Sequence, residues 1–340
     1  MITVVLADRS TQALGKIAVD KSENGHPSAA HCELSDLGRA VAACWEAIPR
    51  FYPGIQIIAK EVMPDHFHGI LWVKRPLDCH LGQVIKGFKL GCNKAAGGPL
   101  FAEGFQDTIL FREGQLAAMI KYLKENPLRL AIKRTSKELF ILKRDIEAPL
   151  GEAGTGHFSA IGNTALLNRP LVQVQCSRRY FAYRRVPKPG GGRKIARDQS
   201  GEPICESCTA EYRNRLEAVL SAAKHGAVLI SPCVSDGERQ IAREALLNGL
   251  PLVTMQNKGF SPLQKPSGRY FEACSEGRLL LLAPAAWPYQ PGEKPMTRFD
   301  ATAMNRVCQL LAGEGAAEIN YHGMTPANID RLALEAVAAK

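Results

Sequence analysis

The chain has 340 residues, about twice the usual length of one domain, so we expect two domains. Hydrophobic residues make up 46% and charged residues 22%, which is ordinary globular usage and excludes a collagen-like, coiled-coil or wholly disordered chain. Lys and Arg number 43 against 33 Asp and Glu, giving a net charge of +10. This excess favours a polyanionic partner but does not separate DNA from RNA or a membrane surface.

The ten cysteines are scattered, and no basic segment followed by an apolar run opens the chain. The longest apolar run, around residues 279–283, is too short to span a bilayer. We therefore expect a reduced cytoplasmic protein that does not bind a membrane and that associates with the nucleoid if DNA is its partner.

The first 150 residues alternate between strand-like and helix-like patterns and predict an α+β domain with one antiparallel sheet. A tight connection at Met63, Pro64 and Asp65 separates two of the strands, and Pro127 is expected to end the last helix. The predicted strands cover residues 2–7, 55–63, 66–74 and 106–111, and the predicted helices cover 34–48, 81–94 and 114–126.

Residues 151–210 are expected to form a linker and basic connector, because glycines recur up to residue 162 and a dense basic stretch follows at 178–197. From residue 211 to 340, helices alternate with continuous apolar strands at 227–231, 252–256 and 279–283. Such strands are typical of a parallel sheet that is covered on both faces, a Rossmann-like α/β domain. Ser235 and Glu238 have capping-box spacing before one of its helices.

His66 and His68 lie two residues apart on a predicted strand, so their side chains face one side while Phe67 faces the other. Two neutral imidazoles held on a rigid sheet are good metal ligands. The alternative is that both histidines are ordinary polar residues at the end of a strand.

Tyr122 and Asn126 lie four residues apart on a predicted helix and therefore on one of its faces. A tyrosine there could serve as a nucleophile, and the amide oxygen of Asn126 could be a third metal ligand. The alternative is that Tyr122 is a packing residue.

Together these motifs resemble the single-tyrosine HUH transposases of the IS200 type, especially the REP-associated tyrosine transposases. The resemblance covers about residues 1–135. Residues 62–71 read Val-Met-Pro-Asp-His-Phe-His-Gly-Ile-Leu, Tyr122 precedes Asn126-Pro127, and Gly87-Phe88-Lys89 and Gly104-Phe105-Gln106-Asp107 lie between them.

The resemblance implies a ferredoxin-like nuclease domain whose central strand holds both histidines. It also implies that His66, His68 and Asn126 bind Mg²⁺ or Mn²⁺, and that Tyr122 attacks a phosphate of single-stranded DNA near a hairpin. The products are a 5′-phosphotyrosine and a free 3′-hydroxyl. A phenol with a pKa of about 10 is a weak nucleophile, so positive charge or a proton acceptor is needed nearby.

Basic side chains are the expected DNA contacts. Lys86 and Lys89 share a helix beside the recognised motifs, although each could equally be a solvated surface residue. Arg178 and Arg179 begin the dense basic stretch.

The second domain weakly resembles the Rossmann-like domain of DNA-processing protein A, which implies binding of single-stranded DNA along residues 257–262 and 265–269. Residues 226–238 predict a strand, a tight turn and a helix N-terminus that could hold a phosphate, but a dinucleotide fingerprint and a P-loop lysine are missing. A structural domain without a ligand is the alternative. Cys205 and Cys208 have metal-knuckle spacing without a second pair.

We therefore expect a ferredoxin-like HUH domain followed by a Rossmann-like domain, acting as a metal-dependent enzyme that cleaves and rejoins single-stranded DNA. The main alternative is a domesticated protein that binds single strands or hairpins without effective cleavage. A replication-initiating HUH nuclease is a weaker option, since an attached helicase or origin-binding region is not evident. Both monomers and homodimers are consistent with the resemblance.

Overall fold

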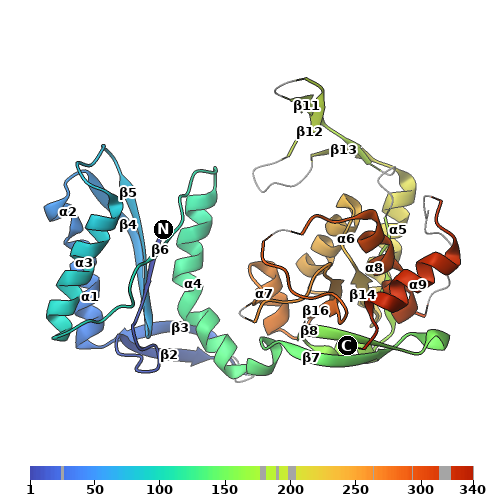
Figure 1. The fold of residues 1–340 in the computed structure, drawn as a ribbon, viewed down its shortest axis with the longest axis horizontal. Coiled ribbons are helices and arrows are strands. Elements are labelled where there is room, and N and C mark those ends of the chain that lie inside the picture. The colour runs from blue at the N-terminus through green and yellow to red at the C-terminus, as the bar shows by residue number, and fades with distance from the viewer. Residues whose placement is uncertain are drawn as a thin grey trace. The chain divides into compact units, whose positions relative to one another are not determined.

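The structure, a computed structural model, describes residues 1–23, 27–176, 181–188, 191–197, 204–262, 264–292, 294–313 and 323–339. The chain divides into two compact units, Met1–Thr135 and Ser136–Lys340 (Figure 1). Each unit has a hydrophobic core of its own. Among the described helices, none is long and apolar enough to cross a membrane.

The first unit is built on a four-stranded sheet with the order β4-β5-β1-β6, in which every neighbouring pair is antiparallel. The strand β5 is interior and pairs with β4 on one side and β1 on the other. The predicted strand at 55–63 is confirmed, and the one at 106–111 is much shorter than expected. The bounds are β1 (Ile2–Val5), β4 (Ile55–Met63), β5 (His66–Val73) and β6 (Gln106–Asp107).

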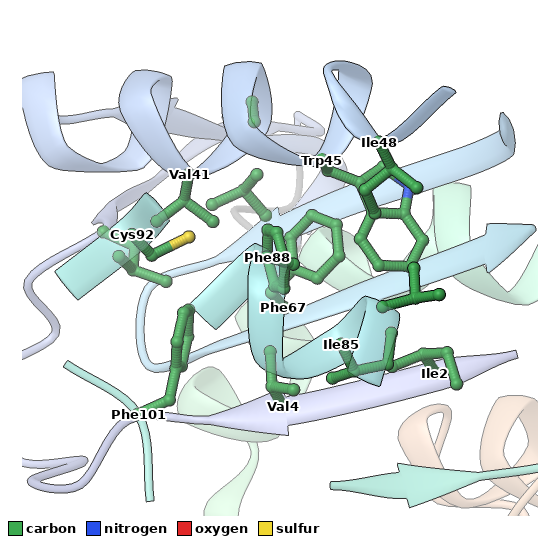
Figure 2. Close-up of a cluster of buried hydrophobic side chains, with 14 of the residues drawn as sticks. Ile2, Val4, Val41, Trp45, Ile48, Phe67, Ile85, Phe88, Cys92 and Phe101 are labelled. Atoms are coloured by element: carbon green, nitrogen blue, oxygen red, sulfur yellow. The ribbon is translucent and has the colours of Figure 1, made fainter. Parts of the chain in front are cut away.

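Three helices pack on one face of this sheet, namely α1 (Asp36–Glu46), α2 (Ile48–Phe51) and α3 (Leu81–Ala96). Figure 2 shows Trp45 and Phe88 from the helices meeting Phe67 from β5 in the core. Gly69 lies directly beneath Trp45, where an added Cβ would lie 2.2 Å from Cζ2 of the indole. Only glycine allows this close contact between β5 and α1.

The helix α4 (Gln115–Thr135) lies on the opposite face of the sheet (Figure 1). The prediction that Pro127 ends this helix is wrong, because Pro127 lies inside it. A proline lacks the N–H that would bond to the carbonyl of Leu123, and its ring crowds that carbonyl, so packing elsewhere must offset this cost. The residues beyond it are held by packing against β4 and against a hairpin that the sequence does not predict, β2 (Gly15–Lys21) with β3 (Pro27–Leu34).

The second unit is built on a six-stranded sheet with the order β7-β8-β16-β15-β14-β9. Four strands, β9, β14, β15 and β16, are mutually parallel, while β8 and β7 extend the sheet in antiparallel fashion. Every residue of β14, β15 and β16 is buried, so both faces of the sheet are covered. The bounds are β7 (Lys143–Pro149), β8 (Thr155–Gly162), β9 (Leu171–Gln173), β14 (Val228–Ser231), β15 (Leu252–Met255) and β16 (Leu279–Pro284).

The expected linker over residues 151–210 is therefore wrong in its first part, which contains β8 and β9. Its glycines form defined turns and close backbone contacts and do not make the chain flexible. Gly151 and Gly154 have φ values of 63° and 93° in the turn before β8. At Gly162 an added Cβ would lie 2.2 Å from the carbonyl oxygen of Leu279.

The capping box predicted at Ser235 is confirmed, because the Ser235 hydroxyl accepts from the Glu238 amide and the Glu238 carboxylate accepts from the Ser235 amide. It begins α6 (Asp236–Leu247). The other α-helices of this unit are α5 (Ala210–Lys224), α7 (Arg269–Ser275), α8 (Arg298–Leu311) and α9 (Pro326–Ala336). Short 3-10 helices lie at Lys137–Leu139, Gly151–Ala153 and Thr164–Asn168.

The expected basic connector contains two small ladders. One pairs β10 (Phe181–Tyr183) with β13 (Cys205–Cys208), and the other pairs β11 (Arg185–Pro187) with β12 (Arg193–Ile195). Arg178 and Arg179 lie outside the described residues.

Candidate active site

The two histidines of β5 bring their ring nitrogens together on the face of the sheet that α4 covers. The Nε2 atoms of His66 and His68 are 3.1 Å apart, and the rings meet edge to face. Phe67 between them is fully buried in the core on the opposite face. Alternation along β5 thus produces the juxtaposition that the sequence predicts.

Each histidine is held from behind through its other ring nitrogen. The Asp65 carboxylate lies 2.6 Å from Nδ1 of His66, and the Thr3 hydroxyl lies 2.8 Å from Nδ1 of His68. Arg9 in turn donates from Nε to the second oxygen of Asp65 at 2.7 Å. Partners of this kind fix the ring orientation and leave both Nε2 atoms available to a cation.

Neither Thr3 nor Asp65 is among the site residues predicted from the sequence. Asp65 directly precedes the His-Phe-His motif, so its position offers a signal. Thr3 has no sequence signal, because it faces His68 only through the β1–β5 register.

The electrostatics of the site favour a neutral His68 and an ionised Asp65. Burial, reinforced by repulsion from His66, lowers the pKa of His68 to about 3. Burial opposes ionisation of Asp65, but hydrogen bonds from His66 and Arg9 outweigh it and lower the pKa of that carboxyl to about 2.

Tyr122 of α4 approaches this pair, and Asn126 lies one turn further along the same helix. The ring of Tyr122 lies 6.2 Å from that of His68 between centroids, and the side chain is exposed on its outer side. Asn126 is buried, and within the described structure its Nδ2 atom is buried without a hydrogen-bond partner. One turn further on, the guanidinium of Arg129 lies 5.6 Å from the Tyr122 ring centroid and places positive charge beside the phenol.

The donor set fits a divalent ion that prefers octahedral coordination. Two ligands at right angles, each about 2.1 Å from such an ion, lie about 3.0 Å apart, close to the spacing of the two Nε2 atoms. A half-turn of the Asn126 amide would place an acceptor oxygen at its unpartnered buried position. In the part of the chain that the structure describes, no three His, Cys, Asp or Glu side chains gather to hold a metal, so a non-acidic third donor would be needed.

An apolar cavity of about 460 Å³ lies in the same unit, and Ile70 and Trp72 are among the residues that line it. Ile70 and Trp72 of β5 alternate with Gly69 and Leu71, so they share the face of His68. Trp72 is 58% exposed, and the Lys74 ammonium lies 5.8 Å from its ring. Trp72 is not among the residues predicted from the sequence.

The two predicted lysines lie apart from this site. Both belong to α3, which packs on the other face of the sheet. Lys86 is exposed, whereas the Lys89 ammonium donates to the carbonyls of Ala102 at 2.5 Å and Gly104 at 2.6 Å. Two of the three Lys89 donors are thus used to hold the 102–104 segment, and burial lowers its pKa.

The phosphate site expected at the N-terminus of α6 is filled by the protein itself. The Glu238 carboxylate accepts from the amides of Val234 at 2.7 Å, Ser235 at 3.2 Å and Cys176 at 3.4 Å. These donors are therefore not open to an anion, and the expected phosphate site at this turn is wrong. Cys205 and Cys208 are both free thiols on β13.

The comparisons with known proteins give matches of low sequence identity. No family model matches the chain. An uncharacterized protein of Haemophilus influenzae is 26% identical over a segment that covers 31% of this chain and 72% of that protein. A solved structure of a REP-associated tyrosine transposase bound to a REP hairpin shares 18% identity with a TM-score of 0.29, covering 38% of this chain and 66% of that chain. Neither similarity is large enough to assign the chain to a family.

Proposed function

We propose that the first unit cleaves and rejoins single-stranded DNA as a metal-dependent HUH transposase, with Tyr122 as its single nucleophile and hairpin-forming DNA as its substrate. The observation on which this rests is the pair of imidazoles, 3.1 Å apart at Nε2, with the Tyr122 ring 6.2 Å from that of His68 between centroids and the buried Asn126 amide one turn further along the same helix. Packing alone does not require two Nε2 atoms to face each other at this spacing.

In the proposed reaction the Tyr122 oxygen bonds to phosphorus as the bond from phosphorus to the 3′-oxygen breaks. The phenol loses its proton to solvent and the leaving 3′-oxygen gains one, giving a 5′-phosphotyrosine and a 3′-hydroxyl. Attack by a 3′-hydroxyl on the phosphotyrosine reverses these changes and rejoins the strand.

The residues of the site would have separate roles in this reaction. His66, His68 and Asn126 would hold Mg²⁺ or Mn²⁺, which when bound draws charge from the phosphate oxygens. Thr3 and Asp65 orient the imidazoles. Arg129 lies against the Tyr122 ring, where its guanidinium would add positive charge to the site of attack.

The apolar cavity beside this site supports a single-stranded substrate. An exposed tryptophan with an ammonium group close to its ring can stack an unpaired base while the cation meets the backbone. We therefore propose that Trp72 stacks a base of the bound strand, and that the basic second unit adds further contacts with DNA.

The test is an adduct assay with a 3′-labelled hairpin oligonucleotide and Mn²⁺, resolved on a denaturing gel, because the fragment joined to Tyr122 keeps the 3′ end of the strand. Wild type should give a band of protein joined covalently to DNA, and Tyr122→Phe should give none while its hairpin affinity by fluorescence anisotropy is unchanged. Tyr52→Phe, which changes a tyrosine packed in the core, is the matched control and should still give the adduct.

Two results would reject the proposal. An adduct that persists in Tyr122→Phe would assign the nucleophile elsewhere. Hairpin binding by wild type without any adduct in Mn²⁺ would instead identify a domesticated binding protein.

A further inference from the structure

A second concave site lies within Ser136–Lys340, in a cavity of about 350 Å³ between α6 and α7. Three arginines line it, Arg239 and Arg243 from α6 and Arg269 from α7. Ala242 and Leu246 of α6 and Tyr270 of α7 provide its apolar wall. The volume is at the lower end of the range of about 300–1,000 Å³ that is typical of small-molecule sites.

One of the three arginines is committed to the local fold. Arg239 pairs with Asp236 and donates to the carbonyls of Cys233 at 3.2 Å and Val234 at 2.8 Å. These contacts secure the loop between β14 and α6 and neutralise the Arg239 charge.

The other two cations are not compensated. Within the described residues, neither Arg243 nor Arg269 has an ion-pair or hydrogen-bond partner, and no carboxylate lines the cavity. Two guanidinium groups facing one cavity repel each other, so an anion between them would relieve an existing cost. Arginine pairs of this kind match the geometry of phosphate oxygens.

The apolar wall indicates what is joined to the anion. Leu246 and Tyr270 offer a hydrophobic surface and an aromatic ring beside the two charges. A flat base next to a phosphate presents this combination of groups, whereas a bare phosphate would leave the apolar wall unused.

We propose that this cavity binds a nucleotide, with its phosphate between Arg243 and Arg269 and its base against Leu246 and Tyr270. The site needs no chemistry at Tyr122 and therefore goes beyond the proposed transposase activity. The same chemistry could come from a free mononucleotide or from a nucleotide of a single strand.

The experiment is isothermal titration of the full chain at low salt with three ligands: deoxyadenosine monophosphate, deoxyadenosine and a 5′-phosphorylated single-stranded oligonucleotide. Arg243→Gln and Arg269→Gln remove charge while keeping most of the side-chain volume. Each should weaken binding by about tenfold to a hundredfold, the loss typical of one charged hydrogen bond. Arg144→Gln is the matched control, since Arg144 is an exposed arginine of the same unit that does not line the cavity.

The ligand arms separate the two sources. A loss for the monophosphate supports a free nucleotide, and a loss for the oligonucleotide alone supports a strand. The proposal is overturned if both arginine variants, with wild-type circular dichroism, bind the monophosphate and the oligonucleotide as wild type does. It is also overturned if deoxyadenosine binds as tightly as its monophosphate. Because none of these titrations depends on adduct formation, they do not share a failure with the transposase test.

Discussion

Each histidine of the pair depends on a neighbour that holds its second ring nitrogen. Asp65 holds His66, and Thr3 holds His68 from a different strand. The sequence predicts the two histidines because their spacing alone places them on one side of a strand. It does not predict Thr3, since that contact exists only once β1 and β5 pair.

At the residue scale, Asp65→Asn should weaken Mn²⁺ binding. The substitution keeps the shape of the side chain but removes the charge that orients and polarises His66, and the loss of such a partner typically costs about tenfold to a hundredfold in metal affinity. Isothermal titration of the full chain with MnCl₂ measures it. Asp20→Asn, at an exposed position on β2, should bind like wild type. Equal affinity of Asp65→Asn and wild type would refute a role for Asp65 behind a metal ligand.

The lowered pKa of His68 predicts a pH dependence of stability in protein stripped of metal. Its folded pKa is about 3, below the ordinary value of 6.5. Between these two pH values the unfolded chain therefore binds a proton at His68 and the folded chain does not. Stability from this group is complete above pH 6.5 and falls as the pH drops toward 3. Between pH 7 and pH 5 the loss should be about 2 kcal/mol.

Guanidinium unfolding at both pH values measures this loss in a Trp287→Phe background, in which the tryptophan fluorescence comes from Trp45 and Trp72 of the first unit. His68→Asn should lack the loss, while His31→Asn, at an exposed histidine of the same unit, should keep it. An identical pH dependence in His68→Asn and wild type would show that His68 is not buried as a neutral group.

At the element scale, helices cover β5 on both faces of the sheet. The position of this strand therefore sets the positions of the two histidines. Its bounds follow closely from the sequence, because alternating residues and the Pro64-Asp65 turn are local signals. The length of α4 does not follow from the sequence. Local rules end it at Pro127, whereas packing against β2, β3 and β4 extends it to Thr135.

Gly69→Ala should destabilise the first unit and disturb the histidines with it. An added methyl group would lie 2.2 Å from the Trp45 indole, and overpacking of a filled core typically costs about 1–3 kcal/mol. Thermal unfolding followed by tryptophan fluorescence measures the change. Gly82→Ala, where nothing lies within 4 Å of the added group, should leave stability unchanged or slightly raised. Equal stability of Gly69→Ala and wild type would contradict the close packing of β5 on α1.

At the scale of the whole molecule, the chain contains two cores with no residue in common. Calorimetry should accordingly resolve two unfolding transitions. Saturating Mn²⁺ should raise only the transition of Met1–Thr135, because a ligand stabilises only the unit that binds it. A single transition that shifts as a whole with Mn²⁺ would contradict this expectation.

The sequence by itself determines the strands 55–63 and 66–73, the capping box at Ser235, the buried parallel strands of the second unit and the pairing of His66 with His68. All of these depend on signals within a few residues of each other, such as alternation, spacing and caps. Tertiary structure alone decides the rest. Thr3 reaches His68 through strand register, Gly162 fits against Leu279, and Arg243 and Arg269 line one cavity. Each of these arrangements brings together residues that lie far apart in the sequence, so it forms only when the chain folds.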